Sequence, residues 1–148
     1  MKKLLLIASA FIIGLSASAQ KTDDFVKLKS EKFDFGKIKQ NVPVTTYFEF
    51  TNTSNKPVVI ESAVASCGCT TPEYAKEPIA PNATTKIKVG YNAAAAGAFT
   101  KNVTLKLAGV PDAKILVITG EVLDAAAYDT YVKNQKTKGA AAKTTKGS

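Results

Sequence analysis

Residues 66–72, Ser-Cys-Gly-Cys-Thr-Thr-Pro, lie near the middle of a chain of 148 residues, and strand-like segments lead into and out of them. These segments alternate or concentrate apolar side chains, and they cover residues 33–36, 44–51, 58–64, 84–91, 99–107 and 115–122. Glycine, proline and asparagine mark turns between them at intervals of roughly 8–12 residues, with no helical pattern in between. We therefore expect about seven strands in one all-β domain.

The alternation within the strands predicts which side chains face a core. Phe48 and Phe50 share one face of their strand, and Glu49 lies on the other. The apolar run at residues 115–122 loses this alternation, which is typical of a strand buried on both faces. The pattern predicts an immunoglobulin-like antiparallel β-sandwich over residues 30–123. The inter-sheet disulfide of antibody domains is excluded, because it joins distant strands and the two cysteines here are separated by a single residue.

The first 19 residues have the parts of a secretory signal peptide: a basic start, an apolar run and small residues before Gln20. A membrane anchor is the alternative, but the run at residues 4–15 is shorter than the roughly 20 residues that span a bilayer. We expect a protein exported to the periplasm, the cell surface or the medium. After cleavage we expect no membrane span and a polar leader at residues 20–29.

The chain changes character after residue 123. Asp124 can cap a helix, and Tyr128 and Tyr131 fall at helical spacing, so we expect a short helix at residues 124–136. Residues 137–148 are mainly lysine, glycine, alanine and threonine, and we expect them to form a disordered tail.

Basic charge is concentrated near the C-terminus. Residues 132–148 contain five lysines and no acidic residue, whereas residues 20–131 contain 13 lysines and 12 acidic residues. The chain has no arginine, so the folded body lacks both the basic face and the guanidinium groups typical of nucleic-acid binding, which we exclude. The lysine-rich tail predicts a weak, salt-sensitive attraction to anionic lipids or glycans.

Cys67 and Cys69 are the two cysteines, and Gly68 between them lets the backbone bend. Residues two apart in a strand are about 6.6 Å apart at Cα, near the upper limit for a disulfide of about 6.8 Å. Four states are open. The pair can be a structural disulfide, which an oxidising compartment favours, or a redox-active bridge, because a small strained ring is easily reduced. It can also be a soft-metal site for Cu(I), since zinc would need two more ligands, or two buried thiols.

The residues around the cysteines form no catalytic constellation. The chain has no histidine that could act as the base for a cysteine nucleophile. Lys76 would lower the pKa of a thiol if it lay close, and Glu73 and Glu77 are carboxylates in the following loop, where glutamates are usually only solvated. We therefore expect a protein that is not an enzyme and that needs no cofactor.

Six motifs follow one another along the folded body: Phe33-x-Phe35-Gly36, Phe48-x-Phe50-Thr51-Asn52-Thr53, Ser66-Cys67-Gly68-Cys69-Thr70-x-Pro72, Pro78-Ile79-x-Pro81, Gly97-x-Phe99-x-Lys101 and Leu116-x-Ile118-x-Gly120-x-Val122. In this order they resemble domain-of-unknown-function family 1573, whose members are exported proteins of Gram-negative bacteria. The resemblance implies a Hydin-type immunoglobulin-like domain, in agreement with the strand pattern, and it implies no established activity.

Two positions depart from the pattern of that family. Asn82 stands where the turn after Pro81 usually has glycine, and asparagine tolerates the left-handed backbone of such a turn. Tyr74 stands where the family often has tryptophan, and we expect it to form an aromatic lid over Cys67 and Cys69.

The leading interpretation is an exported, non-catalytic immunoglobulin-like module that binds a protein or glycan of the cell envelope or has a structural role there. The alternative is thiol redox chemistry or copper handling at Cys67 and Cys69. An exposed apolar face would favour the first interpretation, and sulfur atoms at an exposed loop tip would favour the second.

Overall fold

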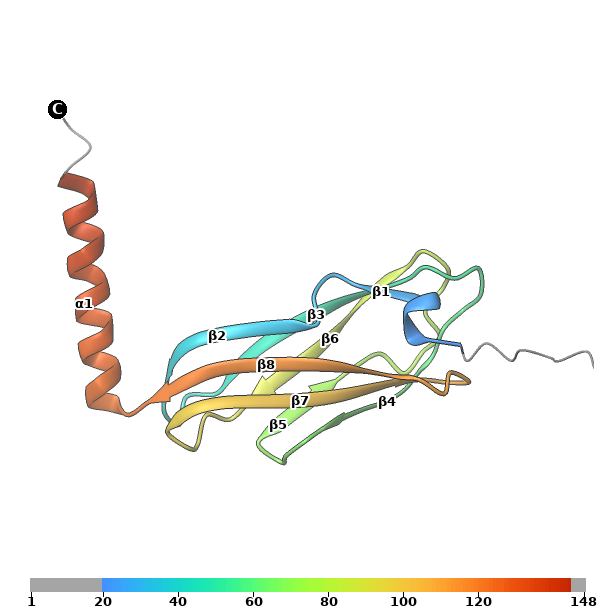
Figure 1. The fold of residues 1–148 in the computed structure, drawn as a ribbon, viewed down its shortest axis with the longest axis horizontal. Helices are drawn as coiled ribbons and strands as arrows, with labels where there is room; N and C mark the ends of the chain where they lie inside the picture. The colour runs from blue at the N-terminus through green and yellow to red at the C-terminus, as the bar shows by residue number, and fades with distance from the viewer. Residues whose placement is uncertain (1–19, 145–148) are drawn as a thin grey trace, which may run out of the picture.

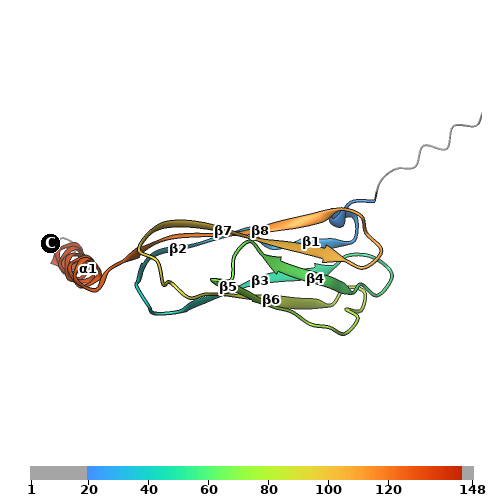
Figure 2. The same ribbon diagram turned by 90° about the horizontal axis from the view of Figure 1, so that it is seen from below.

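The computed structural model describes residues 20–144, with side chains described to residue 137. The predicted signal peptide and the last part of the predicted tail, residues 145–148, lie outside the described residues. Two packed sheets form the body, and a helix follows at one end (Figure 1, Figure 2). A 3-10 turn (Thr22–Asp24) precedes β1 (Val26–Leu28), β2 (Lys32–Lys39), β3 (Val44–Asn52), β4 (Ile60–Ala65), β5 (Thr70–Glu73), β6 (Thr84–Tyr91), β7 (Gly97–Leu107), β8 (Ala113–Leu123) and α1 (Ala125–Thr144).

The strands are distributed as in an immunoglobulin-like sandwich. Sheet A has the order β1-β3-β6-β5, and sheet B has the order β2-β8-β7-β4. Neighbouring strands are antiparallel except β2 and β8, which are parallel. The first strand is divided, with β1 in sheet A and β2 in sheet B, and β1 and β5 are the two strands that the six predicted segments do not cover. The predicted fold class is confirmed.

The core lies between the sheets and follows from the alternation in the strands. Phe48 and Phe50 of β3 and Ile87 of β6 point inward from sheet A, and Leu105 of β7 and Leu116 of β8 point inward from sheet B. Each of these side chains is at most 2% exposed. Burial of a large apolar side chain contributes about 1.5–3 kcal/mol, so this row supplies much of the stability.

The outer face of β8 differs from the prediction. Its inner residues Leu116 and Ile118 are buried, but Ile115 is 42% exposed and Val117 is half-buried. The expectation that this strand is buried on both faces is therefore wrong. Sheet A covers only the inner face, and α1 leaves the sandwich at the end of β8 instead of covering the sheet (Figure 1).

Short strands and a bulge are absent from the sequence prediction. β1 and β5 are too short to show alternation, and Pro72 fits in β5 because β5 is an edge strand. Gly36 does not end β2 as expected: with φ of 65° it lies in a bulge between Asp34 and Lys37, after which pairing with β8 resumes. Asn82, which stands where this turn usually has glycine, has φ of 62°, as expected for the left-handed backbone of the turn.

The segment before β2, expected to be a polar leader, is packed into the sandwich. Thr22 is fully buried; its N–H donates to Asp112 Oδ2 and its hydroxyl to the Asp112 carbonyl, each at 3.0 Å. Lys114 forms ion pairs with Asp23 at 2.6 Å and with Glu31 at 2.8 Å. The Thr22 N–H lowers the pKa of Asp112, and hydrogen bonds to Asp23 and then Glu31 raise the pKa of Lys114. These contacts fix the segment to the start of β8.

The helix α1 begins where the sequence predicts it. The Ala127 N–H donates to Asp124 Oδ1 at 2.8 Å, so Asp124 caps the helix. The helix continues past the predicted end at residue 136, so the described part of the expected disordered tail, residues 137–144, is helical. Alanine and lysine have high helix propensity, which accounts for the difference.

The start of α1 contacts sheet B through two side-chain pairs. Lys39 Nζ lies 3.9 Å from Asp129 Oδ1, and Lys37 Nζ lies 5.8 Å from the centroid of the Tyr131 ring. Within residues 20–144, no helix is both long and apolar enough to cross a membrane.

Asn52 is polar and yet fully buried at the end of β3. Its Nδ2 donates to the carbonyl groups of Lys56 and Ile79, each at 2.8 Å. Its Oδ1 accepts from the N–H of Ser54 at 2.9 Å and from the Ser54 hydroxyl at 2.7 Å. One side chain thus forms hydrogen bonds with polar groups of the loop after β3 and joins this loop to the segment before β6.

We expect Asn52→Ala to lower the free energy of unfolding by about 3 kcal/mol, because the four hydrogen bonds of a fully buried amide disappear and the shorter side chain leaves a cavity. Urea unfolding measures this value. Asn102→Ala is the matched control: its side chain is exposed, and the expected change is below about 0.5 kcal/mol. Equally small effects in both variants would contradict the role assigned to Asn52.

Gly120 of β8 lies opposite Phe99 of β7. The Phe99 ring also stacks on Tyr91, with ring centroids 4.2 Å apart, and is buried. A Cβ atom at position 120 would lie 2.8 Å from the Phe99 ring and 2.9 Å from the Gly36 carbonyl oxygen. The close approach of ring and backbone therefore requires glycine here.

Gly120→Ala should destabilise the domain by about 2 kcal/mol, because the ring or the backbone must shift to admit the methyl group. The control is Gly68→Ala, where the new Cβ would meet no atom within 4 Å, and its effect should be small. Urea unfolding of both variants tests the argument, which fails if Gly120→Ala unfolds at the same denaturant concentration as wild type.

Candidate functional site

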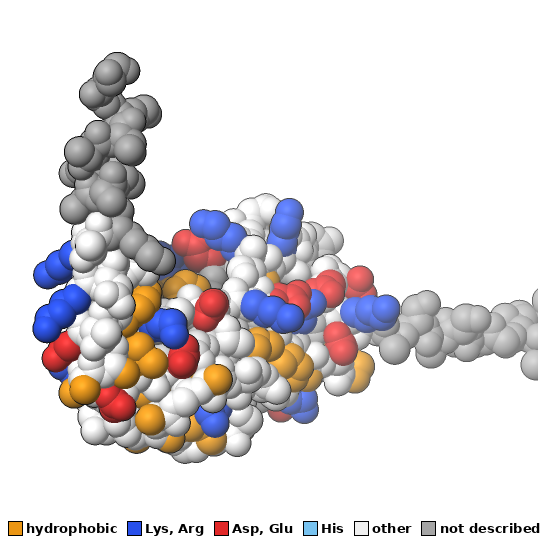
Figure 3. All heavy atoms as spheres, turned by 60° about the vertical axis from the view of Figure 1, so that its left-hand side comes forward, with side chains coloured by type: hydrophobic (Ala, Val, Ile, Leu, Met, Phe, Trp, Pro, Cys, Tyr) orange, Lys and Arg blue, Asp and Glu red, His pale blue; other side chains and the backbone are white. Residues whose placement is uncertain are grey.

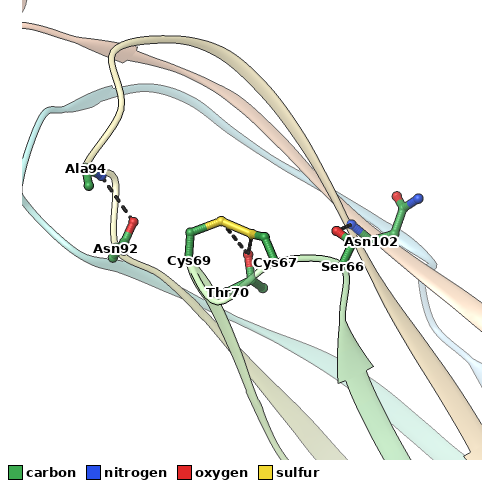
Figure 4. Close-up of a disulfide and its surroundings, with 7 residues drawn as sticks. All are labelled: Ser66, Cys67, Cys69, Thr70, Asn92, Ala94 and Asn102. Atoms are coloured by element: carbon green, nitrogen blue, oxygen red, sulfur yellow. Dashed lines mark hydrogen bonds between the residues drawn. A yellow bond between two sulfur atoms is a disulfide. The ribbon is translucent and has the colours of Figure 1, made fainter.

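The cysteine motif forms the turn between β4 and β5, which are edge strands of different sheets. The Ser66 N–H donates to the Asn102 carbonyl at 2.8 Å, and the Ser66 hydroxyl accepts from the Asn102 N–H at 3.2 Å. On the opposite side, the Asn92 N–H donates to the Cys69 carbonyl at 3.0 Å. Residues 66–69, the cysteine turn, are therefore attached to both sheets (Figure 4).

Cys67 and Cys69 are joined by a disulfide, with 5.3 Å between their Cα atoms. Both residues are half-buried, and Gly68 between them is exposed. Cys69 packs against the edge of the hydrophobic core. Of the four states that the sequence leaves open, the geometry fits a bridge, either structural or redox-active, and does not fit two buried thiols.

A soft-metal site is not assembled around these sulfur atoms. Cu(I) binds thiolates, and the sulfur atoms of a disulfide are not thiolates, so the bridge would first have to be reduced. In the part of the chain that the structure describes, no group of three or more His, Cys, Asp or Glu side chains comes together to hold a metal ion.

Thr70 places a hydroxyl group against the disulfide (Figure 4). The residue is 4% exposed, and its Oγ1 lies 3.7 Å from Cys67 Sγ and 3.8 Å from Cys69 Sγ. Thr70 is part of the cysteine motif, but its residue type in the sequence predicts no role for it. Its position directly after Cys69, at the start of a strand, is the signal that points to it.

Tyr74 and Lys76, both considered for the cysteine site, contact each other. Lys76 Nζ lies 3.8 Å from the centroid of the Tyr74 ring, and the Tyr74 hydroxyl donates to the Glu61 carbonyl at 3.4 Å. Glu61 is near the start of β4, whereas the disulfide follows the end of β4. These contacts lie away from the sulfur atoms, and the lid over the disulfide stays a prediction.

The outer face of sheet A is covered by ion pairs. Glu49 lies 3.1 Å from Lys29 and 3.8 Å from Lys86, and Glu73 lies 3.0 Å from Lys88. The hydrogen bond from Lys29 lowers the pKa of Glu49, and the hydrogen bond to Glu73 raises the pKa of Lys88. Glu73, considered from the sequence as an acid–base residue, is thus paired on a solvated surface.

The outer face of sheet B has an uncharged centre. Val64 of β4 is 60% exposed and lies opposite Thr104 of β7, which lies opposite Ile115 of β8. The next outward residue of β8 is Val117, opposite Asn102. We call these five residues the B-face patch. The patch adjoins the cysteine turn, because β4 ends one residue after Val64.

A depression with a volume of about 550 Å³ lies where α1 leaves sheet B, lined in part by Lys37, Leu123 and Tyr131. Charges of both signs are mixed over this end of the molecule, and hydrophobic side chains gather at the base of the helix (Figure 3). The depression lies between the helix and the body, and its lining also includes the polar residues Asp124, Thr130 and Asn134.

A family model described as "Protein of unknown function (DUF1573)" matches residues 26–122. No curated protein matches the chain. Among solved structures, a protein of unknown function from Porphyromonas gingivalis W83 is similar, with a TM-score of 0.57 and 14% identity over 66% of this chain. The chain spans 46% of the length of that protein.

Two further structures show the same fold. The ASH / PapD-like domain 7 of human CEP192 has a TM-score of 0.55 and 10% identity, covering 82% of this chain and 99% of that domain. The VesB protease of Vibrio cholerae has a TM-score of 0.55 and 13% identity, covering 68% of this chain and 33% of the protease. At these identities the likeness concerns the sandwich alone.

The described contacts of Tyr74 predict, against the expected lid, that Tyr74→Ala leaves the rate of disulfide reduction by dithiothreitol unchanged. The Tyr74 ring packs against the core and Lys76, and its hydroxyl donates to Glu61. The rate is measured by alkylation of the released thiols and mass spectrometry. Tyr47→Ala, on the outer face of sheet A, is the control. Faster reduction in Tyr74→Ala alone would establish the lid.

Proposed function

The chain belongs to the DUF1573 family of proteins of unknown function, and on its sandwich fold and B-face patch we propose that it is an exported, non-catalytic module that binds another protein of the cell envelope. The partner contacts the outer face of sheet B and presents an apolar surface with acidic residues at its rim.

The outer face of β8 is the observation that carries this proposal. A strand with apolar residues on both faces is typical of burial on both sides, yet Ile115 and Val117 of β8 face outward with no second layer over them in the described structure. Val64, at 60% exposed, lies on the same face of the sheet in β4, with Thr104 of β7 between it and Ile115. Contiguous exposed apolar surface marks interaction sites on folded domains.

The charges beside the patch indicate the chemistry of the partner. Lys32 lies in register with Val117, and Lys106 follows Thr104 on the outer face of β7. Neither lysine forms an ion pair with another residue of the described chain. Interfaces with an apolar centre and a charged rim gain specificity from complementary charge, so acidic groups on the partner would face these lysines.

The two outer faces of the sandwich differ, which supports one face as the binding surface. On sheet A the lysines and glutamates already neutralise one another in exposed pairs. On sheet B, Lys37 pairs with Glu121 toward the helix end, whereas the B-face patch and the neighbouring Lys32 and Lys106 have no ion pairs among the described residues. Tyr47, 56% exposed on sheet A, therefore provides a control position of similar exposure.

The location of the protein is part of the proposal. The basic start, apolar run and small residues before Gln20 favour export, and the mature protein would meet its partner in the periplasm or at the cell surface. Fractionation of the host cell, followed by mass analysis of the undigested protein, tests this location. The exported protein should begin at Gln20.

Site-specific photo-crosslinking in the host cell tests the binding surface. A photoreactive amino acid replaces Val64 in one strain and Tyr47 in the other. We expect one distinct protein to be crosslinked from position 64 and not from position 47. With that protein purified, the double variant Val64→Glu/Ile115→Glu should bind it at least about tenfold more weakly, because two carboxylates would be buried against a partner whose charged groups are acidic.

Several results would overturn the proposal. Equal crosslinking from positions 64 and 47 would show non-specific contact. A crosslink between two copies of this chain would make the B-face patch a self-association surface. Unchanged affinity of the double glutamate variant, with unfolding like that of wild type, would place the interface elsewhere.

A further inference from the structure

The Thr70 hydroxyl is buried against the disulfide, where it can donate a stronger hydrogen bond to a cysteine thiolate than to the oxidised bridge. The residue is 4% exposed, and the partners of its hydroxyl among the described residues are the two sulfur atoms, at 3.7 and 3.8 Å. A disulfide sulfur is a weak acceptor, whereas a thiolate carries a full charge and accepts a much stronger hydrogen bond. The hydroxyl gains its best partner only when the bridge opens.

The two cysteines differ in their surroundings. Cys69 packs against the core, and its carbonyl is held by Asn92. Cys67 lies between Ser66 and Gly68, both exposed, and is half-buried itself. This difference favours attack on Cys67 Sγ, with Cys69 Sγ as the leaving group on the protein side.

The charges around the turn do not oppose a thiolate. Glu61 and Glu73 lie toward the ends of β4 and β5 that are remote from the turn. On β7, Lys101 precedes Asn102, the residue that bonds to Ser66, and it is half-buried. The segment between β6 and β7, which bonds to Cys69, contains no charged residue. The nearest charged position along the bonded strands is thus a lysine.

We propose that Cys67 and Cys69 form an exchangeable bridge that takes an electron pair from a dithiol of a partner protein, with the Thr70 hydroxyl stabilising the thiolate that is released. This activity goes beyond a binding module and does not depend on the B-face patch. Thr70 is a positioning residue in this scheme, because it acts on the sulfur atoms and not on the partner.

The exchange proceeds in two balanced steps. A thiolate of the partner attacks Cys67 Sγ, the Cys67–Cys69 bond breaks, and its electron pair leaves on Cys69 as a thiolate that accepts a hydrogen bond from Thr70. The second partner thiol, once deprotonated, attacks the partner sulfur of the mixed disulfide and releases Cys67 as a thiolate. The partner is oxidised from dithiol to disulfide, the Cys67–Cys69 bridge is reduced, and the two protons pass from the partner thiols to the cysteines through solvent.

Equilibration of the mature protein with mixtures of reduced and oxidised glutathione tests the proposal, with acid quenching, alkylation and mass spectrometry as the readout. The variants are Thr70→Val, which keeps the shape and removes the hydroxyl, and Thr70→Ser, which keeps the hydroxyl. Thr71→Val, at the exposed neighbouring position, is the matched control. Urea unfolding of each oxidised variant checks that it is folded.

We expect the wild-type bridge to be reduced within the range of glutathione mixtures. Thr70→Val should lower the equilibrium constant for reduction by about tenfold, while Thr70→Ser and Thr71→Val stay near wild type. In the reduced protein, the pKa of the Cys69 thiol, followed by ultraviolet absorbance of the thiolate, should rise in Thr70→Val alone. A purely structural role of Thr70 would not move this pKa.

Single-cysteine variants test which sulfur is attacked. Cys69→Ser leaves Cys67 free to form a mixed disulfide with oxidised glutathione, and Cys67→Ser leaves Cys69; we expect the Cys67 adduct to form faster. A bridge that stays oxidised in every glutathione mixture would overturn the proposal. Equal effects of Thr70→Val and Thr71→Val would overturn the role of Thr70.

Discussion

The buried amide of Asn52 fixes the crossing from sheet A to sheet B, and the arrangement of the whole sandwich depends on it. At the opposite end of β3, Val44 lies in register with Tyr91, which pairs with Thr70 beside the cysteine turn. The two ends of the sandwich are thus held by different chemistry, a satisfied buried amide at one and a disulfide turn at the other. Because no covalent bond crosses the core, the alignment of the sheets relies on side-chain packing between these two crossings.

The features proposed for function lie together on one side of this frame. β4 carries Val64 of the B-face patch and leads directly into the cysteine turn. A partner that covers sheet B would therefore lie beside Cys67, whose neighbours Ser66 and Gly68 are exposed. Sheet A, with its paired charges, faces the opposite direction and provides the rigid support behind the core.

The sequence predicts the strands of the sandwich well where one face of the strand is buried and the other is exposed to solvent. Phe48 and Phe50 alternate with polar residues because the core lies on one side of β3 only, and β6 and β7 repeat this pattern. For β8 the sequence prediction is wrong, because Ile115 and Val117 are as apolar as the buried row, and no local pattern shows that this face has no second layer in the described structure. β1 and β5 are too short to show a period. The state of the two cysteines, and the contacts of Tyr74, depend on how the turn is held between two sheets, which no local pattern specifies.

The pairing of β2 with β8 has a mechanical consequence. The strands are parallel, and the N-terminal end of the described chain and α1 lie at opposite ends of the long axis (Figure 1). Tension applied between these ends would pull β2 and β8 past each other along their length. The hydrogen bonds between the two strands would then bear the load together in shear, whereas the bonds of a hairpin pulled open at one end break one after another. A domain connected in this way resists extension along its long axis better than it would if only the side-chain contacts of its N-terminal segment and of α1 held the two ends.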